Sequence, residues 1–285
     1  MSSIQEKMGW KDKFDIEQTG KCHYKQIWRY FKNKIQANVM KYMGNKRRIV
    51  NDILPIILEY NTNNIFVDLF CGSCSVIQNV PIIYKRIAND KNKYLIEMFK
   101  SLVNGKEYPK HIDKETYSHY RNIYNQEKKG LLQLTDEQYA EVGWYGWMGS
   151  FNGRFFSGGY AGHNVMQNNG KPRDYITEQI NNTLSQIPYL NGVKFYAEDY
   201  TELDIPQNSI VYCDIPYLGT KQYETSKDFD YERFYNWCRE NQDKYKIFVS
   251  EYSMPDDFKC IWQKEVTNAM NTTKTYKPIE KLFTI

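Results

Sequence analysis

The amino-acid sequence predicts an α/β protein with a doubly wound parallel sheet and a long insertion. The short, continuous apolar run over residues 65–69 is typical of a strand that is buried on both faces, and residues 86–90 are predicted as a second strand that ends on an acid. Segments with apolar side chains at helical spacing lie beside them, so strands and helices alternate along the chain. The alternation stops at about residue 105 and resumes after residue 173, which predicts an insertion over residues 105–173.

The individual elements follow from the same periodicities. Helical spacing of apolar residues predicts helices over 48–60, where Pro55 can introduce a kink, and over 95–102 and 176–187. Further strands are predicted near residues 193–197, 209–212 and 246–250. Residues 1–38 lack a clear helical or strand period and are interpreted as an N-terminal extension.

Basic charge is concentrated at the start of the chain. Residues 1–50 contain twelve Lys or Arg and four Asp or Glu, although the net charge of the whole chain is only +4. With aromatics such as Trp10, Tyr24 and Trp28 nearby, this segment could follow a phosphate backbone, or it could be a helical arm whose aromatics pack on the core. Both readings stay open.

Composition indicates a cytoplasmic protein with a buried core. Of the 285 residues, 41% are hydrophobic, yet no apolar stretch reaches the length of a membrane span and the polar start does not resemble a signal peptide. The six cysteines are expected to be reduced thiols. Cys71 and Cys74 are the only close pair, and we interpret them as small turn residues and predict no metal site.

Two stretches at strand ends have the chemistry of a cofactor site. After the strand that ends at Asp68, the turn residues Gly72, Ser73 and Cys74 are small enough for backbone to approach a ligand closely. Asp90 ends the next strand, the position from which a carboxylate accepts hydrogen bonds from ribose hydroxyls. An adenosine-containing cofactor is therefore expected here, although a glycine turn alone is a weak signal.

Two further motifs are weak signals when each is taken alone. Tyr42, Gly44 and Lys46 form a turn before the first helix, which in isolation is more often a basic loop. Asp199-Tyr200 follows a later strand and could place a carboxylate and a ring beside the adenine of the cofactor; a surface Asp is equally compatible.

The tetrapeptide Asp214-Ile215-Pro216-Tyr217 is the most specific signal. It stands at the carboxyl end of an apolar strand, where ligands bind in doubly wound sheets. A carboxylate and a backbone carbonyl can accept the two N–H bonds of an aromatic amine, and Tyr217 can stack on the ring that carries the amine. The alternative, a strand-terminating turn, does not explain this combination of groups.

In content and order these motifs resemble the D12 class of N6-adenine DNA methyltransferases, the class that includes DNA adenine methylase, from Met40 to the C-terminus. Cofactor motifs come first, then the insertion, then the tetrapeptide, which is the order of the α group. The resemblance implies an S-adenosylmethionine-dependent methyltransferase sheet, with residues 39–104 and 174–285 as the catalytic domain and 105–173 as a target-recognition insert. It also implies methylation of N6 on an adenine flipped out of double-stranded DNA.

The resemblance assigns residues by motif. The expected cofactor residues are Tyr42, Gly44, Lys46, Asp68, Phe70, Gly72, Asp90, Asp199 and Tyr200, and the expected catalytic residues are Asp214, Ile215, Pro216 and Tyr217. In the insert, Phe151-Asn152-Gly153-Arg154 resembles the recognition region, so Asn152 and Arg154 are predicted to contact DNA. Alternatively, Phe151, Phe155 and Phe156 form a small core of the insert with Arg154 solvated.

Two positions depart from the pattern of the class. Cys74 replaces a second glycine, and Ile215 replaces the first proline of the tetrapeptide. Because Ile215 keeps the carbonyl and precedes Pro216, which restricts it to extended conformations, activity is expected to survive.

Alternative functions are methylation of another planar amine, such as an RNA base, cytosine N4 or a glutamine side chain, and a catalytically silent DNA-binding relative. The intact Asp214 and Tyr217 argue against a silent relative. A restriction endonuclease is conceivable as a counterpart in a bacterial or phage-infected cell, whereas the recognition site and the oligomeric state cannot be read from the sequence.

Overall fold

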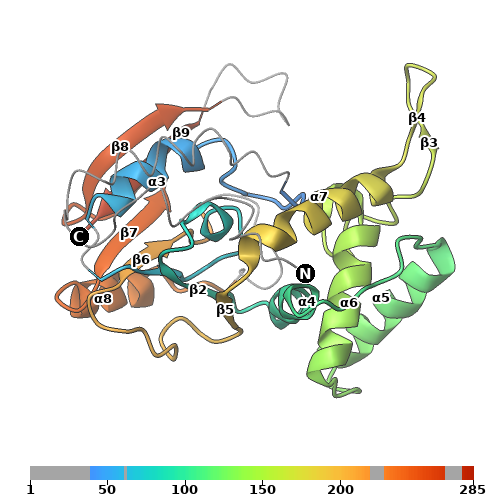
Figure 1. Cartoon of the computed structure of the whole chain (residues 1–285), viewed down its shortest axis with the longest axis horizontal. Coiled ribbons are helices and arrows are strands. Elements are labelled where there is room, and N and C mark those ends of the chain that lie inside the picture. The colour runs from blue at the N-terminus through green and yellow to red at the C-terminus, as the bar shows by residue number, and fades with distance from the viewer. Residues whose placement is uncertain (1–38, 61–62, 219–227, 267–277) are drawn as a thin grey trace, which may run out of the picture. The chain divides into compact units, whose positions relative to one another are not determined.

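The computed structural model describes residues 39–60, 63–218, 228–266 and 278–285. These residues are built around a seven-stranded sheet with the order β5-β2-β1-β6-β7-β9-β8 (Figure 1). The strands are β1 (Ile65–Asp68), β2 (Lys85–Asn89), β5 (Val193–Tyr196), β6 (Ile210–Cys213), β7 (Lys246–Glu251), β8 (Lys259–Glu265) and β9 (Ile279–Thr284). The five strands from β5 to β7 are parallel, and β9 runs antiparallel to both of its neighbours.

The sheet is doubly wound, which confirms the predicted fold class. The chain leaves β1 for β2 and β5 on one side and later returns to β6 and β7 on the other side of β1. A topological switch point therefore lies between β1 and β6, where open α/β sheets bind ligands at the carboxyl ends of their strands. The central strands are buried on both faces: Phe66 and Val67 of β1 and all four residues of β6 are buried.

In the described ranges, four helices cover the sheet, and the first three of them lie close to their expected positions. They are α3 (Val50–Leu58), α4 (Lys93–Val103), α7 (Tyr175–Leu190) and α8 (Tyr231–Asn241). Side chains cap three of them, because Asn92, Asp174 and Asp230 each accept a hydrogen bond from a backbone N–H in the first turn of α4, α7 and α8. The helix α3 continues through Pro55 as one element. Among the described residues, α8, β8 and β9 have no counterpart in the sequence-based expectations.

The predicted insert contains more regular structure than its composition suggested. It holds α5 (Lys114–Lys128), α6 (Asp136–Gly149), the short 3-10 helix η2 (Phe151–Gly153) and the two-residue strands β3 (Val165–Met166) and β4 (Pro172–Arg173). Figure 1 shows α5 and α6 side by side next to α4, with the β3–β4 hairpin projecting beyond α7. All seven strands of the main sheet lie outside residues 105–173 in the chain.

The glycines of α6 lie in a buried helix and permit close packing. The segment from Trp144 to Gly149 is buried helix. A Cβ at Gly143 would lie 2.1 Å from the carbonyl oxygen of Tyr94 in α4, and one at Gly146 would lie 2.3 Å from the ring of Phe155. The glycines are therefore needed so that neighbouring elements can pack closely against α6.

An aromatic core fills the insert. Phe155 packs against Trp147, with ring centroids 4.8 Å apart, and Phe156 packs against Tyr124 at 5.4 Å. Phe151 instead contacts Tyr175 at the start of α7. Of the three phenylalanines considered above, Phe155 and Phe156 are thus part of the internal core.

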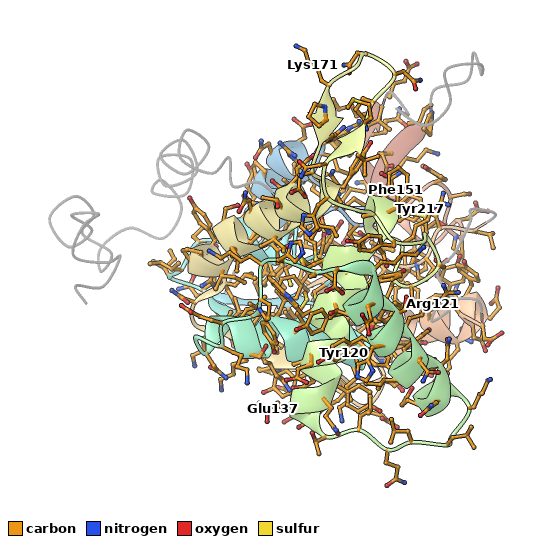
Figure 2. The ribbon with its side chains drawn as sticks, turned by 90° about the vertical axis from the view of Figure 1, so that its right-hand side faces the viewer. Tyr120, Arg121, Glu137, Phe151, Lys171 and Tyr217 are labelled. Atoms are coloured by element: carbon orange, nitrogen blue, oxygen red, sulfur yellow. The ribbon has the colours of Figure 1, made fainter. Side chains whose placement is uncertain are left out.

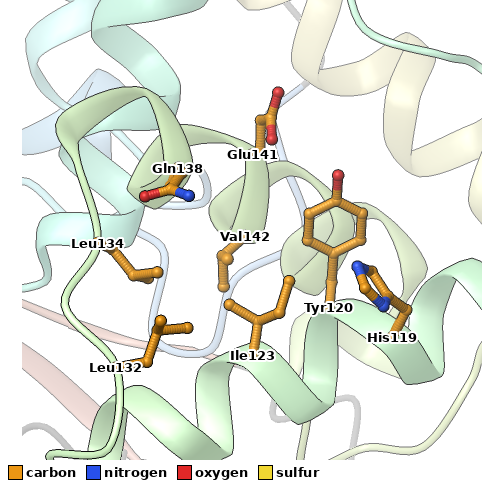
Figure 3. Close-up of a pocket in the computed structure, with 8 residues that line it drawn as sticks. All are labelled: His119, Tyr120, Ile123, Leu132, Leu134, Gln138, Glu141 and Val142. Carbon is orange, nitrogen blue, oxygen red and sulfur yellow. The ribbon is translucent and has the colours of Figure 1, made fainter.

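A separate hollow of about 190 Å³ lies between α5, α6 and the loop that joins them (Figure 3). Its apolar walls are formed by Ile123, Leu132, Leu134 and Val142, and none of its lining residues was predicted as a site residue. No helix in the described ranges combines the length and the apolar character needed to cross a membrane. The N-terminal extension 1–38, with its basic and aromatic residues, lies outside the described residues.

Candidate active site

The candidate site lies where the parallel strands end, around the switch point. Asp68 is the last residue of β1, Asp90 follows β2, and Asp214 follows β6. The register Asp68↔Tyr212 and the 2.9 Å bond from the Leu69 N–H to the Tyr212 carbonyl hold the ends of β1 and β6 together. The structure thus brings together three of the predicted site carboxylates, from three separate parts of the chain.

The glycine turn after β1 is tied directly to the predicted ribose acid. The Gly72 N–H donates to Asp90 Oδ2 at 2.9 Å, and the Asn92 N–H donates to Asp90 Oδ1 at 2.8 Å. Gly72 has φ +46°, and a Cβ there would lie 3.0 Å from the ring of Tyr42. Glycine is favoured by both the backbone conformation and the covering ring, and Tyr42 is the residue that closes over the turn.

One carboxylate oxygen of Asp68 is buried without a hydrogen-bond partner among the described residues. Its Oδ2 accepts a 3.2 Å hydrogen bond from the Ile77 N–H, whereas its buried Oδ1 has no hydrogen-bond partner among the described residues. Burial, together with the nearby Asp214, raises the pKa of Asp68 well above its usual value. The buried hydroxyl of Ser73 is also unpaired within the described part of the chain. An ammonium group would compensate this orphaned acceptor, and the amino-acid end of S-adenosylmethionine carries one.

Lys46 joins the upstream turn to the tetrapeptide. Its Nζ lies 2.6 Å from Asp214 Oδ1, donates to the Gly44 carbonyl at 3.0 Å, and lies 4.5 Å from the centre of the Tyr217 ring. The side chain is only 6% exposed. The turn positions it because Gly44 adopts φ +82° and the Lys46 N–H donates to the Ser75 hydroxyl at 3.1 Å. Predicted as a cofactor residue, Lys46 contacts the predicted catalytic acid.

The electrostatics of Asp214 follow from this arrangement. Burial raises its pKa from 3.8 to about 6, while the charge of Lys46 and its hydrogen bond act in the opposite direction. Glu280 and Asp90 raise the pKa further through their negative charges. Asp214 is therefore mostly an ionised acceptor at neutral pH, but its pKa lies much closer to pH 7 than the pKa of an exposed aspartate does.

The rest of the tetrapeptide is held from several elements. Ile215 is buried in the core beside β6. The Pro216 carbonyl accepts a 2.8 Å bond from the Tyr231 hydroxyl of α8. The hydroxyl of Tyr217 donates to Glu280 Oε2 on β9 at 2.7 Å.

The residue after the tetrapeptide is also fixed. The Leu218 N–H donates to Glu251 Oε1 at 2.6 Å, and Glu251 is the buried last residue of β7. Sequence reasoning missed Tyr231, Glu251 and Glu280. A usable signal existed only for Glu251, an acid at the end of a predicted strand and thus at the same sheet edge as Asp214.

Asp199, Phe70 and Tyr200 lie at the β1 and β5 side of the site. Asp199 accepts bonds from the N–H and hydroxyl of Thr201, and it lies 3.5 Å from the cationic nitrogens of both Lys91 and Arg233. The rings of Phe70 and Tyr200 pack 5.4 Å apart, and the Tyr200 hydroxyl lacks a hydrogen-bond partner in the described ranges. The structure thus brings these three predicted residues together, with one buried polar group left for a ligand.

Asn152 and Arg154 lie on a turn within the insert that packs against the turn upstream of α3. Gly153, between them, packs so closely on the upstream turn that a Cβ would lie 2.1 Å from the Lys41 carbonyl oxygen. Asn152 is exposed with φ 54°, and Arg154 is half-buried. Their predicted role in DNA contact remains a prediction.

The chain is similar to known proteins. The sequence model described as D12 class N6 adenine-specific DNA methyltransferase matches residues 42–277. The chain is also 27% identical over 217 residues to the type II methyltransferase M.FokI of Planomicrobium okeanokoites. That alignment covers 68% of this chain and 31% of the relative, so the chain spans about a third of the length of the curated relative that it matches.

Proposed function

Because the chain belongs to the D12 class of N6 adenine-specific DNA methyltransferases, we propose that it transfers a methyl group from S-adenosylmethionine to adenine N6 in double-stranded DNA. The observation that carries this proposal is the environment of the Lys46 ammonium group. A nitrogen with N–H bonds is held there between a carboxylate oxygen of Asp214 at 2.6 Å and the ring of Tyr217 at 4.5 Å. A site of this kind suits an amine on a flat ring.

The chemistry of the acceptor requires such a site. The lone pair of an aromatic amine is delocalised into its ring, so the amine is a weak nucleophile. By accepting one N–H bond, the Asp214 carboxylate favours the pyramidal nitrogen and stabilises the positive charge that develops on it. The Ile215 carbonyl is assigned the second N–H, and Tyr217 the stacking contact that orients the ring. The new C–N bond would form as the bond between the methyl group and the sulfonium breaks, with the electron pair left on sulfur as a neutral thioether, and the amine proton would be lost toward Asp214 or solvent.

S-adenosylmethionine supplies an electrophilic methyl group bound to a sulfonium. We assign its amino-acid end to Asp68, whose Oδ1 is buried and unpaired among the described residues. We assign its ribose hydroxyls to Asp90, because each carboxylate oxygen keeps a lone pair after accepting one backbone N–H. Phe70 and Tyr200, with the unpaired Tyr200 hydroxyl, are assigned to the adenine side.

A base must leave the double helix to reach this pocket, because Tyr217 is only 9% exposed. We assign the DNA-facing role to the β3–β4 hairpin and the adjoining turn at Asn152 and Arg154. The hairpin combines a 66% exposed Met166 with the amide side chains of Gln167, Asn168 and Asn169 and with the basic Lys171. Lys171 lies at the projecting end of the hairpin in Figure 2.

The test uses the full chain with S-adenosylmethionine labelled in the methyl group. Duplex DNA, single-stranded DNA and structured RNA are offered separately, and the recovered nucleosides are separated. N6-methyladenine from duplex DNA, lost in Asp214→Ala, is the expected product. Label in cytosine or only in RNA would favour the other planar amines. Unlabelled DNA, despite measurable cofactor binding, would favour a silent DNA-binding relative.

The cellular setting is part of the proposal. The relative is named a type II methyltransferase, which favours action in a bacterial or phage-infected cell and leaves room for a companion restriction endonuclease. A methylation map of DNA from cells that express the chain would give the target sequence. Resistance of that DNA to endonucleases of matching specificity would support the restriction role.

A further inference from the structure

Glu280 lies against the tetrapeptide although it belongs to neither group of predicted site residues. It is the second residue of β9, an antiparallel strand paired with β7 on one side and β8 on the other. Its Oε2 accepts a 2.7 Å hydrogen bond from the phenol of Tyr217, more than sixty residues earlier in the chain. The last described strand of the protein therefore reaches directly into the candidate active site.

The charge of Glu280 acts on both functional groups of the tetrapeptide. After burial and Asp214, it contributes to raising the pKa of the Tyr217 phenol well above its usual value. Burial is the main cause of the raised pKa of Asp214, and the charge of Glu280 adds to it. With its raised pKa the Tyr217 phenol stays protonated at neutral pH and donates to Glu280.

Tyr217 is held by contacts to its ring and by the hydrogen bond at its hydroxyl. Tyr252 meets the ring edge-on with centroids 4.6 Å apart, and the Lys46 ammonium lies 4.5 Å from its centre. Both contacts are made to the ring, and Lys46 has to yield space when an amine binds at Asp214. The Glu280 bond is made at the phenol end and is anchored in a strand with ladder bonds on both sides.

We propose that Glu280 is a positioning residue for methyl transfer: its carboxylate holds the phenol of Tyr217 so that the ring is already oriented to stack on the target base. The proposal rests on the proposed function for its substrate, but not for the contact itself. Pre-orientation of this ring acts on the chemical step, because the target amine has to meet Asp214 and the Ile215 carbonyl at the same time. A purely structural role of Glu280 would instead affect the stability of β9.

The first experiment reports on the ring without DNA or cofactor. Tyr217 is replaced by 3-fluorotyrosine in the full chain, and its fluorine NMR signal is compared in wild type, Glu280→Ala and Glu280→Gln. The alanine variant is expected to shift and broaden the signal, and the glutamine variant, which keeps an acceptor oxygen, to restore most of it. Glu265→Gln, on the exposed end of the neighbouring strand β8, is the matched control and should leave the signal unchanged.

The second experiment measures methyl transfer. Glu280→Ala is expected to lower the single-turnover rate about 10- to 100-fold while S-adenosylmethionine affinity stays within about twofold. Glu280→Gln should recover most of that rate. The low-pH side of its pH–rate profile, here called the acid limb, should move to lower pH because a negative charge near Asp214 is gone. In a Tyr217→Phe background, which lacks the phenol, Glu280→Gln should have little further effect on the rate.

The outcomes separate the two proposals. An unchanged fluorine signal in Glu280→Ala overturns the positioning role, whatever the substrate proves to be. A changed fluorine signal with unchanged methyl transfer also overturns it, because the orientation would then not matter for the reaction. Equal losses of rate in the wild-type and Tyr217→Phe backgrounds would show that Glu280 does not act through the phenol. If the wild type transfers no methyl group to DNA, the proposed function fails, and the positioning role fails with it as a role in methyl transfer.

Discussion

The contact between Lys46 and Asp214 predicts an unusual pH dependence of methyl transfer. The pKa of Asp214 is about 6 in the structure, above the usual 3.8, because burial outweighs the opposing effect of Lys46. As the pH falls, the carboxylate is therefore protonated near pH 6, whereas an exposed aspartate would stay ionised to about pH 4. With a pKa of about 6, the ionised fraction is about nine-tenths at pH 7 and about one-tenth at pH 5, so kcat/KM should fall about tenfold over that interval.

Lys46→Met tests the cause of this acid limb. The variant keeps an unbranched chain of similar length but removes the charge that lies 2.6 Å from Asp214 Oδ1. Loss of an opposite charge this close raises a carboxyl pKa by about 1–3 units, so the acid limb should move upward by that amount. At pH 7 the variant should retain between about one-half and one-hundredth of its maximal rate, the part that corresponds to ionised Asp214.

The assay measures kcat/KM for duplex DNA with labelled S-adenosylmethionine from pH 5 to pH 9, because this parameter reports groups of the free enzyme. Cofactor affinity is measured separately by calorimetry, so a binding defect is recognised. Lys41→Met is the matched control: it lies on the same turn but pairs with Glu178 at 2.8 Å, so its acid limb should coincide with that of the wild type. Superimposable limbs for Lys46→Met and wild type would refute the reasoning, as would a wild-type limb near pH 4.

Three further variants test other parts of the site. Asp90→Asn should weaken S-adenosylmethionine binding by roughly 1–3 kcal/mol in calorimetry, because a charged acceptor for ribose hydroxyls is lost; wild-type affinity would assign the ribose to another residue. Cys74 is buried with φ +60°, so Cys74→Val should lower the free energy of unfolding by roughly 1–2 kcal/mol in denaturant titrations while Cys74→Gly is tolerated; an unchanged midpoint for the valine variant would contradict the left-handed turn. Arg154→Ala should weaken DNA binding by roughly 1–3 kcal/mol if the arginine reads a guanine edge, or make the salt slope shallower by about one unit if it contacts phosphate; if only Lys171→Ala changes binding, the hairpin carries recognition instead.

The sequence by itself determined the parallel part of the sheet and the edge at which the site lies. β1 and β6 are short, largely apolar runs, a pattern that reflects burial on both faces, and β2 is a short segment with Ile87 and Ala88 at its centre. Each is followed or ended by an acid, and the carboxyl ends of parallel strands meet at one edge. The convergence of Asp68, Asp90 and Asp214 is therefore a consequence of local pattern plus one general rule of topology.

Local pattern was misleading where packing decides the conformation. The Gly- and Trp-rich segment of α6 has no polar face, because it is buried nearly all round, and it therefore shows little helical period. Its glycines are required by close contact with Tyr94 and Phe155. Whether a glycine signals freedom or close packing depends on neighbours that are distant in sequence.

Only the tertiary structure decided which charges surround the reactive groups. Lys46 reaches Asp214 across the switch point, and Glu280 reaches Tyr217 because β9 is inserted between β7 and β8 rather than added at the sheet edge. Neither contact has a local signature, since strand order is set by the burial of whole faces and not by the residues of one segment. The sequence could therefore identify the acid of the site, while its pKa and the orientation of its aromatic partner follow from side chains that only the folded sheet brings to them.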